Sequence, residues 1–317
     1  MKRIGNIYNK IYSPDNLVKA EAFARIRKNK QYGVKSFDKN RDANFATLEH
    51  LLVTETYITS PYKIFIKKGR KDRTIYRLPY FPDRICQHAI MNVIKEMFVR
   101  NFIANTYSCI EGKGVGAAVT DMKAALQDKE NTEYYLQLDI NKFYPSVTHR
   151  ILKKLLRRKI KCERTLRLVD GIIDSAPGLP IGNYLSQYLA NFYLSNFDHW
   201  LKEVKGVKHY FRYSDDMIIL ASNKAELHQL RIDIEQYLKD NLNLNIKPNW
   251  RVAPVDAHGI DFLGYVFFHT HTRLRKRNKQ AFARSVARRA KQSTIAAYTG
   301  LASHANCKHL TKKLLAA

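Results

Sequence analysis

The 317-residue chain lacks the segments that mark membrane and secreted proteins. No stretch approaches the ~18 uninterrupted apolar residues that a membrane helix requires, and the N-terminal residues lack the apolar core of a secretory signal. The four cysteines, at positions 86, 109, 162 and 307, are scattered without paired spacing. They are typical of reduced, packed thiols and argue against a zinc site or a disulfide framework. We therefore expect a cytoplasmic protein.

Acidic residues are scarce. Against 28 Asp and Glu stand 55 Lys and Arg, which gives a formal net charge of +27 and a pI near 9.9. This excess predicts a polyanionic partner, with nucleic acid first and an anionic membrane surface second. Because the cations are spread over several segments and not gathered on one amphipathic helix, we expect no membrane partner. The 56 residues after Asp261 contain twelve Lys or Arg and no acid, so we expect this segment to follow phosphates.

No internal repeat, low-complexity block or Gly/Ser linker divides the chain, whose composition (45% hydrophobic, 11% aromatic) is globular. Hydrophobic periodicity predicts helices in five places: within 1–45, over 83–103, over 224–242, as one long helix after Gly182, and as one basic helix after Pro145 that carries the eight Lys and Arg between 151 and 167. Alternating patterns predict strands in four places: a basic-tipped hairpin over 62–78, a strand over 134–138, a hairpin around 207–213 and 217–221, and two strands about 262–265.

Acidic residues stand at the ends of predicted hydrophobic strands. Asp139 follows the strand over 134–138, and Asp215 and Asp216 form the tip of the later hairpin. If Asp215 and Asp216 are considered without Asp139, a simple polar turn would explain them. A third acid at the mouth of a neighbouring strand favours another interpretation, because clustered carboxylates repel one another and hard divalent cations relieve that repulsion. Two such cations can activate a 3′-hydroxyl and stabilise a departing pyrophosphate.

Several motifs, in one order over roughly residues 50–270, resemble those of reverse transcriptases. The matching segments are 73–76 with Pro79 in the fingers segment, 83–87 in the helix that follows it, Asp139 in motif A, Gly182 and Ser186 in motif B, 213–216 in motif C, 242–247 in motif D and 262–265 in the primer grip. The resemblance implies an α+β right-hand polymerase, whose palm combines an antiparallel sheet with helices. It divides the chain into a basic N-terminal helical segment over 1–45, the fingers and palm over 46–270, and a short basic helical thumb over 271–317.

The resemblance also assigns catalytic roles. Asp139 and Asp215 would bind two Mg²⁺ ions, or Mn²⁺ in their place, and Asp216 would lie beside them as the third member of the same catalytic and metal-binding set. Arg73, with Lys71 or a neighbouring lysine, would hold the incoming triphosphate by charge-assisted hydrogen bonds.

The remaining roles concern the nucleotide and the primer. Tyr144 would exclude a ribose 2′-hydroxyl, or else packs in the core. Lys247 would protonate the leaving pyrophosphate, or else is one more surface lysine. The other implied contacts are Ile181, Gly182 and Gln187 with the nucleotide, and Phe262, Leu263, Gly264 and Tyr265 with the primer.

Motif B departs from the pattern Gln-Gly-x-x-x-Ser-Pro of retron and group II intron enzymes. Ile181 replaces the first Gln and Gln187 replaces the Pro, a combination that resembles the reverse transcriptases of diversity-generating retroelements. Since Ile181 offers only shape where Gln would offer hydrogen bonds, we expect poorer discrimination against wrong pairs, by ~1–3 kcal/mol for each missing hydrogen bond. The alternative is that Ile181 merely packs and fidelity is ordinary.

This resemblance implies an error-prone RNA-dependent DNA polymerase that copies a template-repeat RNA into adenine-mutagenised cDNA for targeted gene diversification. The implied setting is a bacterial, archaeal or phage-infected cell, and the implied partners are the template RNA and cDNA duplex, dNTPs and a pentameric basic accessory variability protein. Alternatives are a retron-like or phage-defence reverse transcriptase of ordinary fidelity, and a catalytically silent RNA-binding module. The intact Asp139, Asp215 and Asp216 argue against the silent module.

Overall fold

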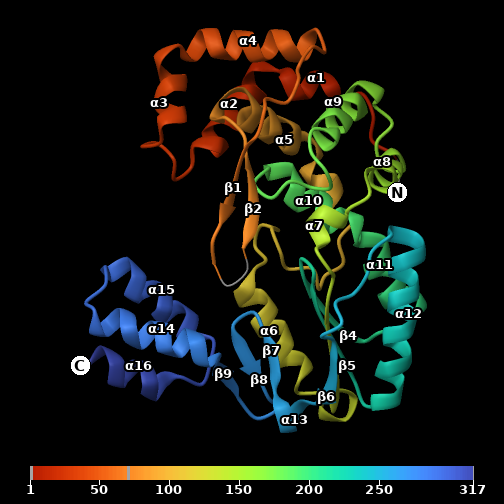
Figure 1. Cartoon of the computed structure of the whole chain (residues 1–317), viewed down its shortest axis with the longest axis vertical. Coiled ribbons are helices and arrows are strands. Elements are labelled where there is room, and N and C mark those ends of the chain that lie inside the picture. Colours follow the sequence, from red (N-terminus) through yellow and green to blue (C-terminus); the bar gives the residue numbers. More distant parts are fainter. Residues whose placement is uncertain (1–2, 70–71, 317) are drawn as a thin grey trace. The chain divides into compact units, whose positions relative to one another are not determined.

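The computed structural model describes residues 3–69 and 72–316. The chain forms two compact units that alternate along the sequence (Figure 1). Unit 1 contains Met1–Ile103, Asn141–Asp198 and Leu238–Leu244, and unit 2 contains Ala104–Ile140, His199–Tyr237 and Asn245–Ala317. The predicted boundaries at 45 and 270 follow fingers, palm and thumb and stay predictions. Within the described part of the chain, no helix combines the length and hydrophobicity needed to cross a bilayer.

Unit 1 is built around one buried helix, α5 (Ile85–Val99). Its side chains are buried on almost every side, as expected of a helix enclosed by other helices, and α1, α2 and α10 pack against it. The other elements of this unit are α1 (Tyr8–Tyr12), α2 (Pro14–Arg25), α3 (Tyr32–Lys39), α4 (Arg41–Val53), β1 (Lys63–Lys67), β2 (Arg73–Arg77), the π-helical turn η1 (Tyr80–Arg84), α7 (Phe143–Ser146), α8 (His149–Arg157), α9 (Glu163–Asp174), α10 (Tyr184–Tyr193) and most of α11 (Ser195–His199).

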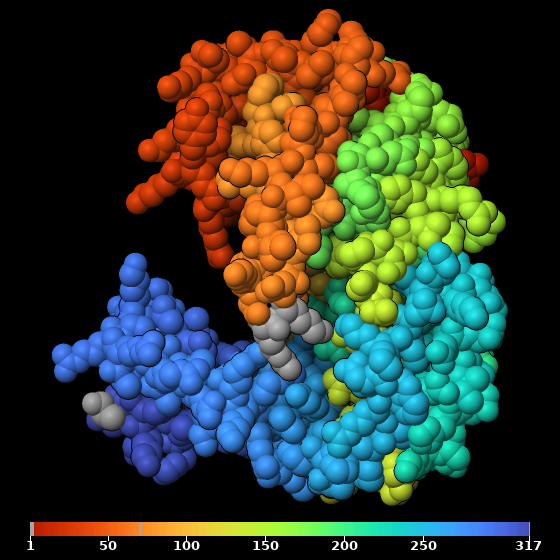
Figure 2. Space-filling view, viewed as in Figure 1, coloured from red at the N-terminus to blue at the C-terminus, as the bar shows by residue number. Residues whose placement is uncertain are grey.

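Strands β1 and β2 form the predicted basic hairpin. They pair antiparallel, with Lys63 opposite Arg77 and Lys67 opposite Arg73. All of β1 is exposed, and the hairpin (orange) forms part of the open surface in Figure 2. A backbone hydrogen bond from the Tyr76 amide to the Ile181 carbonyl joins β2 to motif B. Lys71, predicted at the tip of the hairpin, lies outside the described residues.

Two predictions of helix length were wrong. The basic helix after Pro145 is two helices, α8 and α9, separated by residues 158–162. The long helix after Gly182 is α10 and α11 followed by a π-helical turn, η3 (Trp200–Val204). Several cations of the basic segment form ion pairs, namely Lys153 with Asp174, Arg157 with Asp170, and Arg164 and Arg167 with Glu55. These acids lie outside the window 151–167, so the window alone overstated the charge that is free to meet RNA.

Unit 2 contains a four-stranded antiparallel sheet with the order β4–β5–β3–β6. Its strands are β3 (Tyr134–Asp139), β4 (His209–Tyr213), β5 (Asp216–Ala221) and β6 (Arg251–Pro254). Helix α6 (Val115–Ala125) packs into one hydrophobic core with Tyr135, Phe211 and Ile218, which share one face of the sheet. Most of α12 (Lys224–Leu242) runs beside the sheet in Figure 1. The predicted hairpins over 62–78 and 207–221, and the helices over 83–103 and 224–242, are confirmed.

The C-terminal part of unit 2 shares that core. Phe262 and Tyr265 of a small three-stranded sheet, Phe282 of α14 and Ala302 of α15 belong to the same hydrophobic cluster as α6. The basic C-terminal helices are therefore anchored by apolar burial. The remaining elements of this unit are η2 (Lys129–Asn131), α13 (Val255–His258), β7 (Ile260–Phe262), β8 (Tyr265–Phe267), β9 (Thr272–Leu274), α14 (Lys276–Ala287), α15 (Gln292–Ser303) and α16 (Lys308–Leu315).

Candidate active site

The three predicted catalytic acids meet at one end of the unit 2 sheet. Asp139 ends β3, Asp216 begins β5, and the two are direct cross-strand partners. Partners in an antiparallel pair point to the same face of the sheet, so their carboxylates are neighbours. Asp215 lies in the two-residue turn between β4 and β5, where its carbonyl accepts a hydrogen bond from the Ile140 amide at 3.4 Å. Strand register thus brings together acids that are far apart in the sequence.

A buried arginine that sequence reasoning missed supports this turn. Arg212, on β4, is fully buried, and its Nη1 donates a hydrogen bond to the Ser214 carbonyl at 3.0 Å while Nη2 reaches Thr106 Oγ1 at 3.4 Å. Ser214 has a φ of 59°, in the left-handed region that non-glycine residues adopt at some cost. The guanidinium offsets that cost by binding the carbonyl of the strained residue. The only sequence signal was a cation inside an otherwise apolar strand.

The negative charges of Asp139, Asp215 and Asp216 are only partly neutralised, as the raised pKa values of Asp215 and Asp216 show. Burial raises the pKa of Asp215, and the charge of Asp139 raises it further. Burial, followed by the charges of Asp139 and Asp215, raises the pKa of Asp216 to about 7. A hydrogen bond with Gln137 lowers the Asp216 pKa only in part. Carboxylates that repel each other in this way favour either a proton or a cation between them.

Lys247 lies against the first of these acids. Its Nζ is 2.5 Å from Asp139 Oδ1, and its backbone amide donates a hydrogen bond to the Asp139 carbonyl at 2.8 Å. Asp139 Oδ1 nevertheless has no partner with hydrogen-bond geometry among the described residues, so the side-chain contact is an ion pair without the directionality of a hydrogen bond. The structure therefore places the predicted proton donor beside a predicted metal ligand, while its role stays a prediction.

The residues present suit a divalent metal by donor chemistry. Mg²⁺ prefers carboxylate oxygens, and Asp139 Oδ1 is a buried oxygen that lacks a hydrogen-bond donor in the described part of the chain. Over residues 3–69 and 72–316, however, no three His, Cys, Asp or Glu side chains already surround a common point as metal ligands. The carboxylates thus fit a metal by donor type and by their place at the paired strand ends.

Motif B lies in unit 1 and depends on a glycine. Gly182 has a φ of +131°, and a Cβ there would stand 2.3 Å from the Tyr76 carbonyl oxygen. The Tyr76 amide donates a hydrogen bond to the Ile181 carbonyl at 2.9 Å, which joins β2 to the loop before α10. Only glycine permits this close approach. Ile181 is half-buried and Gln187 is exposed, and the nucleotide contacts of all three motif B residues stay predictions.

Tyr144 is held in place by the loop that precedes motif B. Its carbonyl accepts a hydrogen bond from the Leu179 amide at 2.8 Å, and a Cβ on Gly178 would stand 2.5 Å from the same carbonyl. The ring is half-buried and makes an edge contact with Phe143. Both interpretations of Tyr144, gate and core packing, are compatible with this position. Arg73 begins β2 and is exposed, as a triphosphate ligand must be.

The predicted primer grip is a tight turn between β7 and β8. Leu263 (φ 52°) and Gly264 (φ 94°) both lie in the left-handed region, as a two-residue type I′ hairpin requires. Phe262 and Tyr265 on either side are fully buried, and the Tyr265 hydroxyl donates a hydrogen bond to the Leu301 carbonyl at 2.9 Å. The two aromatic side chains therefore position the turn, and its contact with a primer stays a prediction.

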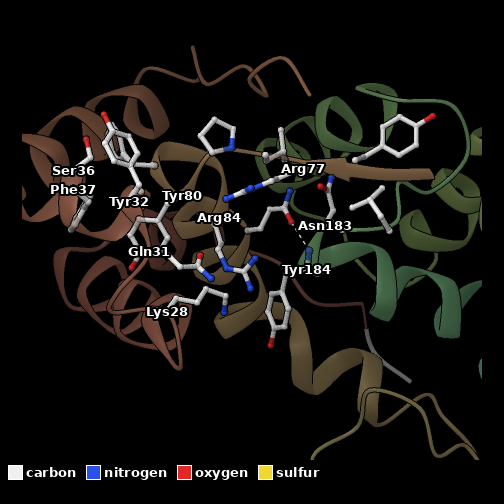
Figure 3. Close-up of a pocket in the computed structure, with 18 of the residues that line it drawn as sticks. Lys28, Gln31, Tyr32, Ser36, Phe37, Arg77, Tyr80, Arg84, Asn183 and Tyr184 are labelled. Atoms are coloured by element: carbon white, nitrogen blue, oxygen red, sulfur yellow. Dashed lines mark hydrogen bonds between the residues drawn. The ribbon is translucent and has the colours of Figure 1, made fainter. Parts of the chain in front are cut away.

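Unit 1 also contains a pocket of about 570 Å³ (Figure 3). Its wall combines the segment from Lys28 through α3, the end of β2 with η1, the start of α5, and Gly182 to Tyr184 before α10. A volume of this size is typical of small-ligand sites. No sequence pattern predicted it, because its residues come from separate segments that only the fold brings together.

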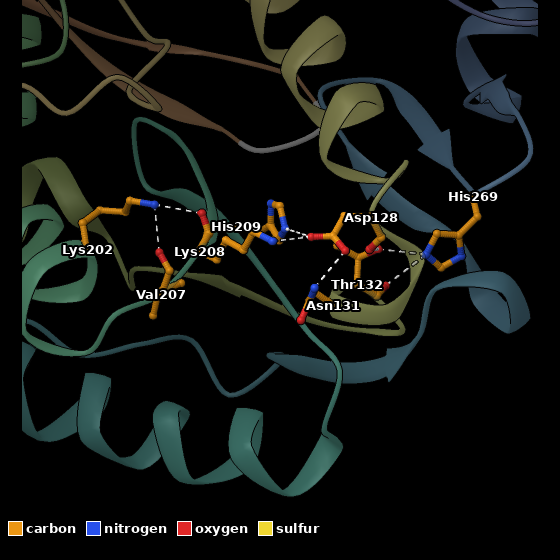
Figure 4. A network of polar contacts seen from close by, with 8 residues as sticks. All are labelled: Asp128, Asn131, Thr132, Lys202, Val207, Lys208, His209 and His269. Carbon is orange, nitrogen blue, oxygen red and sulfur yellow. Dashed lines mark hydrogen bonds and ion pairs between the residues drawn. The ribbon is translucent and has the colours of Figure 1, made fainter.

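Unit 2 contains a polar network away from the carboxylates (Figure 4). Asp128 binds Lys208 at 2.6 Å and His209 at 3.1 Å, and the hydrogen bond from Lys208 holds the pKa of the Asp128 carboxyl far below its usual value. His269 lies 3.0 Å from Thr132 Oγ1 in the same network. These groups satisfy one another and fasten the start of β4 to the segment before β3.

Comparison with known proteins points to one family. A sequence model described as reverse transcriptase (RNA-dependent DNA polymerase) matches residues 66–267, more than half of the chain. Protein YkfC of Escherichia coli strain K12 is 24% identical over 270 residues, which covers 71% of this chain and 69% of YkfC. The segment that the family model matches contains all three predicted catalytic acids, the predicted motif B and the turn between β7 and β8.

Solved telomerase structures share the fold. Apo telomerase from Candida tropicalis superposes with a TM-score of 0.51 at 12% identity, over 67% of this chain and 48% of that one. Telomerase from Candida albicans in complex with a TWJ fragment of telomeric RNA gives a TM-score of 0.53 at 10% identity, over 74% and 51%. The chain spans about half the length of these two telomerase chains. At such low identity the likeness concerns the fold alone, and it confirms the predicted α+β polymerase fold.

Proposed function

Since the chain belongs to the reverse transcriptase family, we propose that it synthesises DNA on an RNA template by adding deoxynucleotides to a primer 3′-hydroxyl. The observation that carries this proposal is the meeting of Asp139, Asp215 and Asp216 at the paired ends of β3 and β5. Asp139 and Asp215 would hold two Mg²⁺ ions, or Mn²⁺ in their place, with Asp216 beside them. When bound, these ions neutralise the charge that develops on the 3′-oxygen and the pyrophosphate.

The chain's own residues would supply binding, orientation and a proton. Arg73 of the hairpin would bind the triphosphate by charge-assisted hydrogen bonds, together with Lys71. Lys247, already beside Asp139, would give up its ion pair when a cation enters and would then be free to protonate the pyrophosphate. Arg212 would act through the turn that it holds, as a positioning residue for Asp215.

Primer extension by the purified chain tests this proposal. The wild type should extend a DNA primer on an RNA template when Mg²⁺ is present, and Asp215→Asn should reduce the rate by about two orders of magnitude or more. Asp42→Asn, which changes an exposed aspartate in the first turn of α4, is the matched control and should extend like the wild type. Unchanged extension by Asp215→Asn would refute the metal-ligand assignment.

We further propose that the chain is the error-prone enzyme of a diversity-generating retroelement. Ile181 supports this proposal, because its carbonyl is fixed by Tyr76 while its side chain has no group with which to test the hydrogen bonding of a base pair. Such an enzyme would copy a template-repeat RNA into cDNA altered at adenines and would work with the pentameric accessory protein. The retron-like alternative predicts ordinary fidelity.

Sequencing of the cDNA separates these two functions. Wild-type product should carry frequent errors opposite template adenines, and Ile181→Gln should reduce them several-fold, since about 1 kcal/mol of added discrimination is worth a factor of about five. Ile58→Gln, at an isoleucine that is 83% exposed in the same unit, controls for the change of residue type. Equal, low error in the wild type and in Ile181→Gln would exclude the mutagenic role and favour the retron-like enzyme.

A further inference from the structure

The pocket in unit 1 is lined by cations without an acid. Lys28, Arg77 and Arg84 line it, and the described wall includes no Asp or Glu. Figure 3 shows the Lys28 ammonium, the Gln31 amide and the Arg84 guanidinium gathered on one side of the pocket. None of the three cations forms an ion pair within the described chain. The positive charge of the pocket is therefore not neutralised by an acid in its described wall, which favours binding of an anion.

Hydrogen-bonding groups in the same wall are also unsatisfied. Arg84 Nε, Gln87 Nε2 and Asn183 Oδ1 are buried and have no hydrogen-bond partner among the described residues. Gln87 is 2% exposed and Asn183 is 4% exposed. The other end of the Gln87 amide accepts a hydrogen bond from the Tyr184 amide at 2.8 Å, so its position is fixed and its Nε2 remains unused. Buried polar groups normally have partners, and three unpartnered groups in one wall indicate a ligand.

The electrostatics agree with the missing anion. Burial lowers the pKa of Arg84, and burial followed by the charge of Arg84 lowers the pKa of Lys28. Burial followed by the charges of Arg84 and Lys28 lowers the pKa of His88 to about 4. The His88 ring stacks on Tyr184 at 4.0 Å between centroids, which holds in place an aromatic ring that lines the pocket.

We propose that this pocket binds one unpaired nucleotide of a single-stranded RNA, with its phosphate on Lys28 and Arg84 and its base against Tyr184. A phosphate alone offers only acceptors, so it could serve the two cations and Gln87 Nε2 but not Asn183 Oδ1. A nucleobase edge offers both donors and acceptors, and stacking on an aromatic ring accepts any base. The choice of RNA as the source of the nucleotide rests on the proposed function.

Binding of a labelled single-stranded RNA of about ten nucleotides, without primer, dNTPs or metal, tests the proposal. Lys28→Gln and Arg84→Gln should each weaken binding about tenfold at physiological salt, because each removes a charge-assisted contact to phosphate. Lys30→Gln removes the same charge from an exposed position two residues beyond Lys28 and outside the pocket wall, and should weaken binding no more than about twofold. Thermal melting of every variant reports whether it folds.

A second measurement does not depend on substitutions in the half-buried Arg84. RNA carrying 4-thiouridine should crosslink to the wild-type chain at Tyr184 or its pocket neighbours, as located by mass spectrometry. If Lys28→Gln and Lys30→Gln weaken RNA binding equally, or if the RNA crosslinks only to other surfaces, the assignment of RNA binding to this pocket is refuted. Competition by free UMP at the concentration where RNA binds would assign the site to free nucleotides, and equal binding of duplex RNA would refute an unpaired one.

These outcomes are independent of the polymerase test. If the pocket assignment fails, the wild type still extends a primer and Asp215→Asn still does not. If the proposed function fails, primer extension is absent while single-stranded RNA still binds through Lys28 and Arg84.

Discussion

Replacing Asp216 by asparagine should stabilise the metal-free protein at neutral pH and impair DNA synthesis. The Asp216 pKa rises from 3.8 to about 7 because of burial and the neighbouring acids. Each pKa unit corresponds to about 1.4 kcal/mol, so about three units set a ceiling of about 4 kcal/mol. Water at the strand ends screens part of this effect, and we expect about 2 kcal/mol in practice.

The direction of the pH dependence follows from linkage. A carboxyl with a raised pKa keeps its proton in the folded state at pH values where the unfolded chain has lost it. Its penalty is therefore absent below about pH 4, grows as pH rises toward about 7, and is constant above that. Asparagine resembles the protonated form at every pH, so the advantage of Asp216→Asn over the wild type should grow over the same window.

Thermal unfolding in EDTA at several pH values measures this effect. At about pH 8 the variant should melt about 4 °C above the wild type, since 1 kcal/mol moves the Tm of a chain this long by about 2 °C, and the gap should shrink by about half at about pH 5.5. Mg²⁺ should raise the wild-type Tm more than that of the variant. Asp42→Asn is again the control. A variant that melts at or below the wild-type temperature under the alkaline condition would refute the account of mutual repulsion.

Two further substitutions test the supports of the site. Gly182→Ala places a Cβ 2.3 Å from the Tyr76 carbonyl and should lower the free energy of unfolding by about 2 kcal/mol. Gly171→Ala in α9, where a Cβ has open space, is the control and should not destabilise the protein. Equal Tm values for the two variants would contradict the close approach. Arg212→Leu leaves the Ser214 carbonyl without its donor and should lower the free energy of unfolding by about 1–3 kcal/mol. It should also lower kcat more than it raises KM. An unchanged kcat would show that the turn needs no such support.

The meeting of Asp139, Asp215 and Asp216 at paired strand ends could be predicted from the sequence because their signal is local. A hydrophobic strand that ends in Asp139, and a hairpin tipped by Asp215 and Asp216, are visible in short windows. Antiparallel register then leaves few ways to arrange two such strands, and the pairing of Asp139 with Asp216 is one of them. The glycine in motif B was predicted from resemblance alone, and its physical reason, the approach of the Tyr76 carbonyl, is visible only in the structure.

Other features could not be predicted because they depend on contacts between distant segments. Composition over 151–167 showed eight cations, but the acids that neutralise several of them lie at Glu55, Asp170 and Asp174. Arg212 showed in the sequence only as a cation inside an apolar strand, without the partners that the fold gives it, namely the Ser214 carbonyl and Thr106. A window of sequence records charge but not the partner that cancels it.

Two sites in the described chain hold charges of one sign that are not fully neutralised, and each indicates a ligand of the opposite sign. At other places in the described chain, clustered charges of opposite sign are paired, as with Glu55 or Asp128. At the carboxylates of unit 2 the acids outnumber the lysine beside them, and the pKa values of Asp215 and Asp216 rise. In the pocket of unit 1 cations lie together without an acid in the described wall, and the pKa values of Lys28 and Arg84 fall. Like charges held together by a fold destabilise it, so each site should gain stability from a ligand of the opposite sign: a divalent cation at the carboxylates, and a nucleotide phosphate in the pocket.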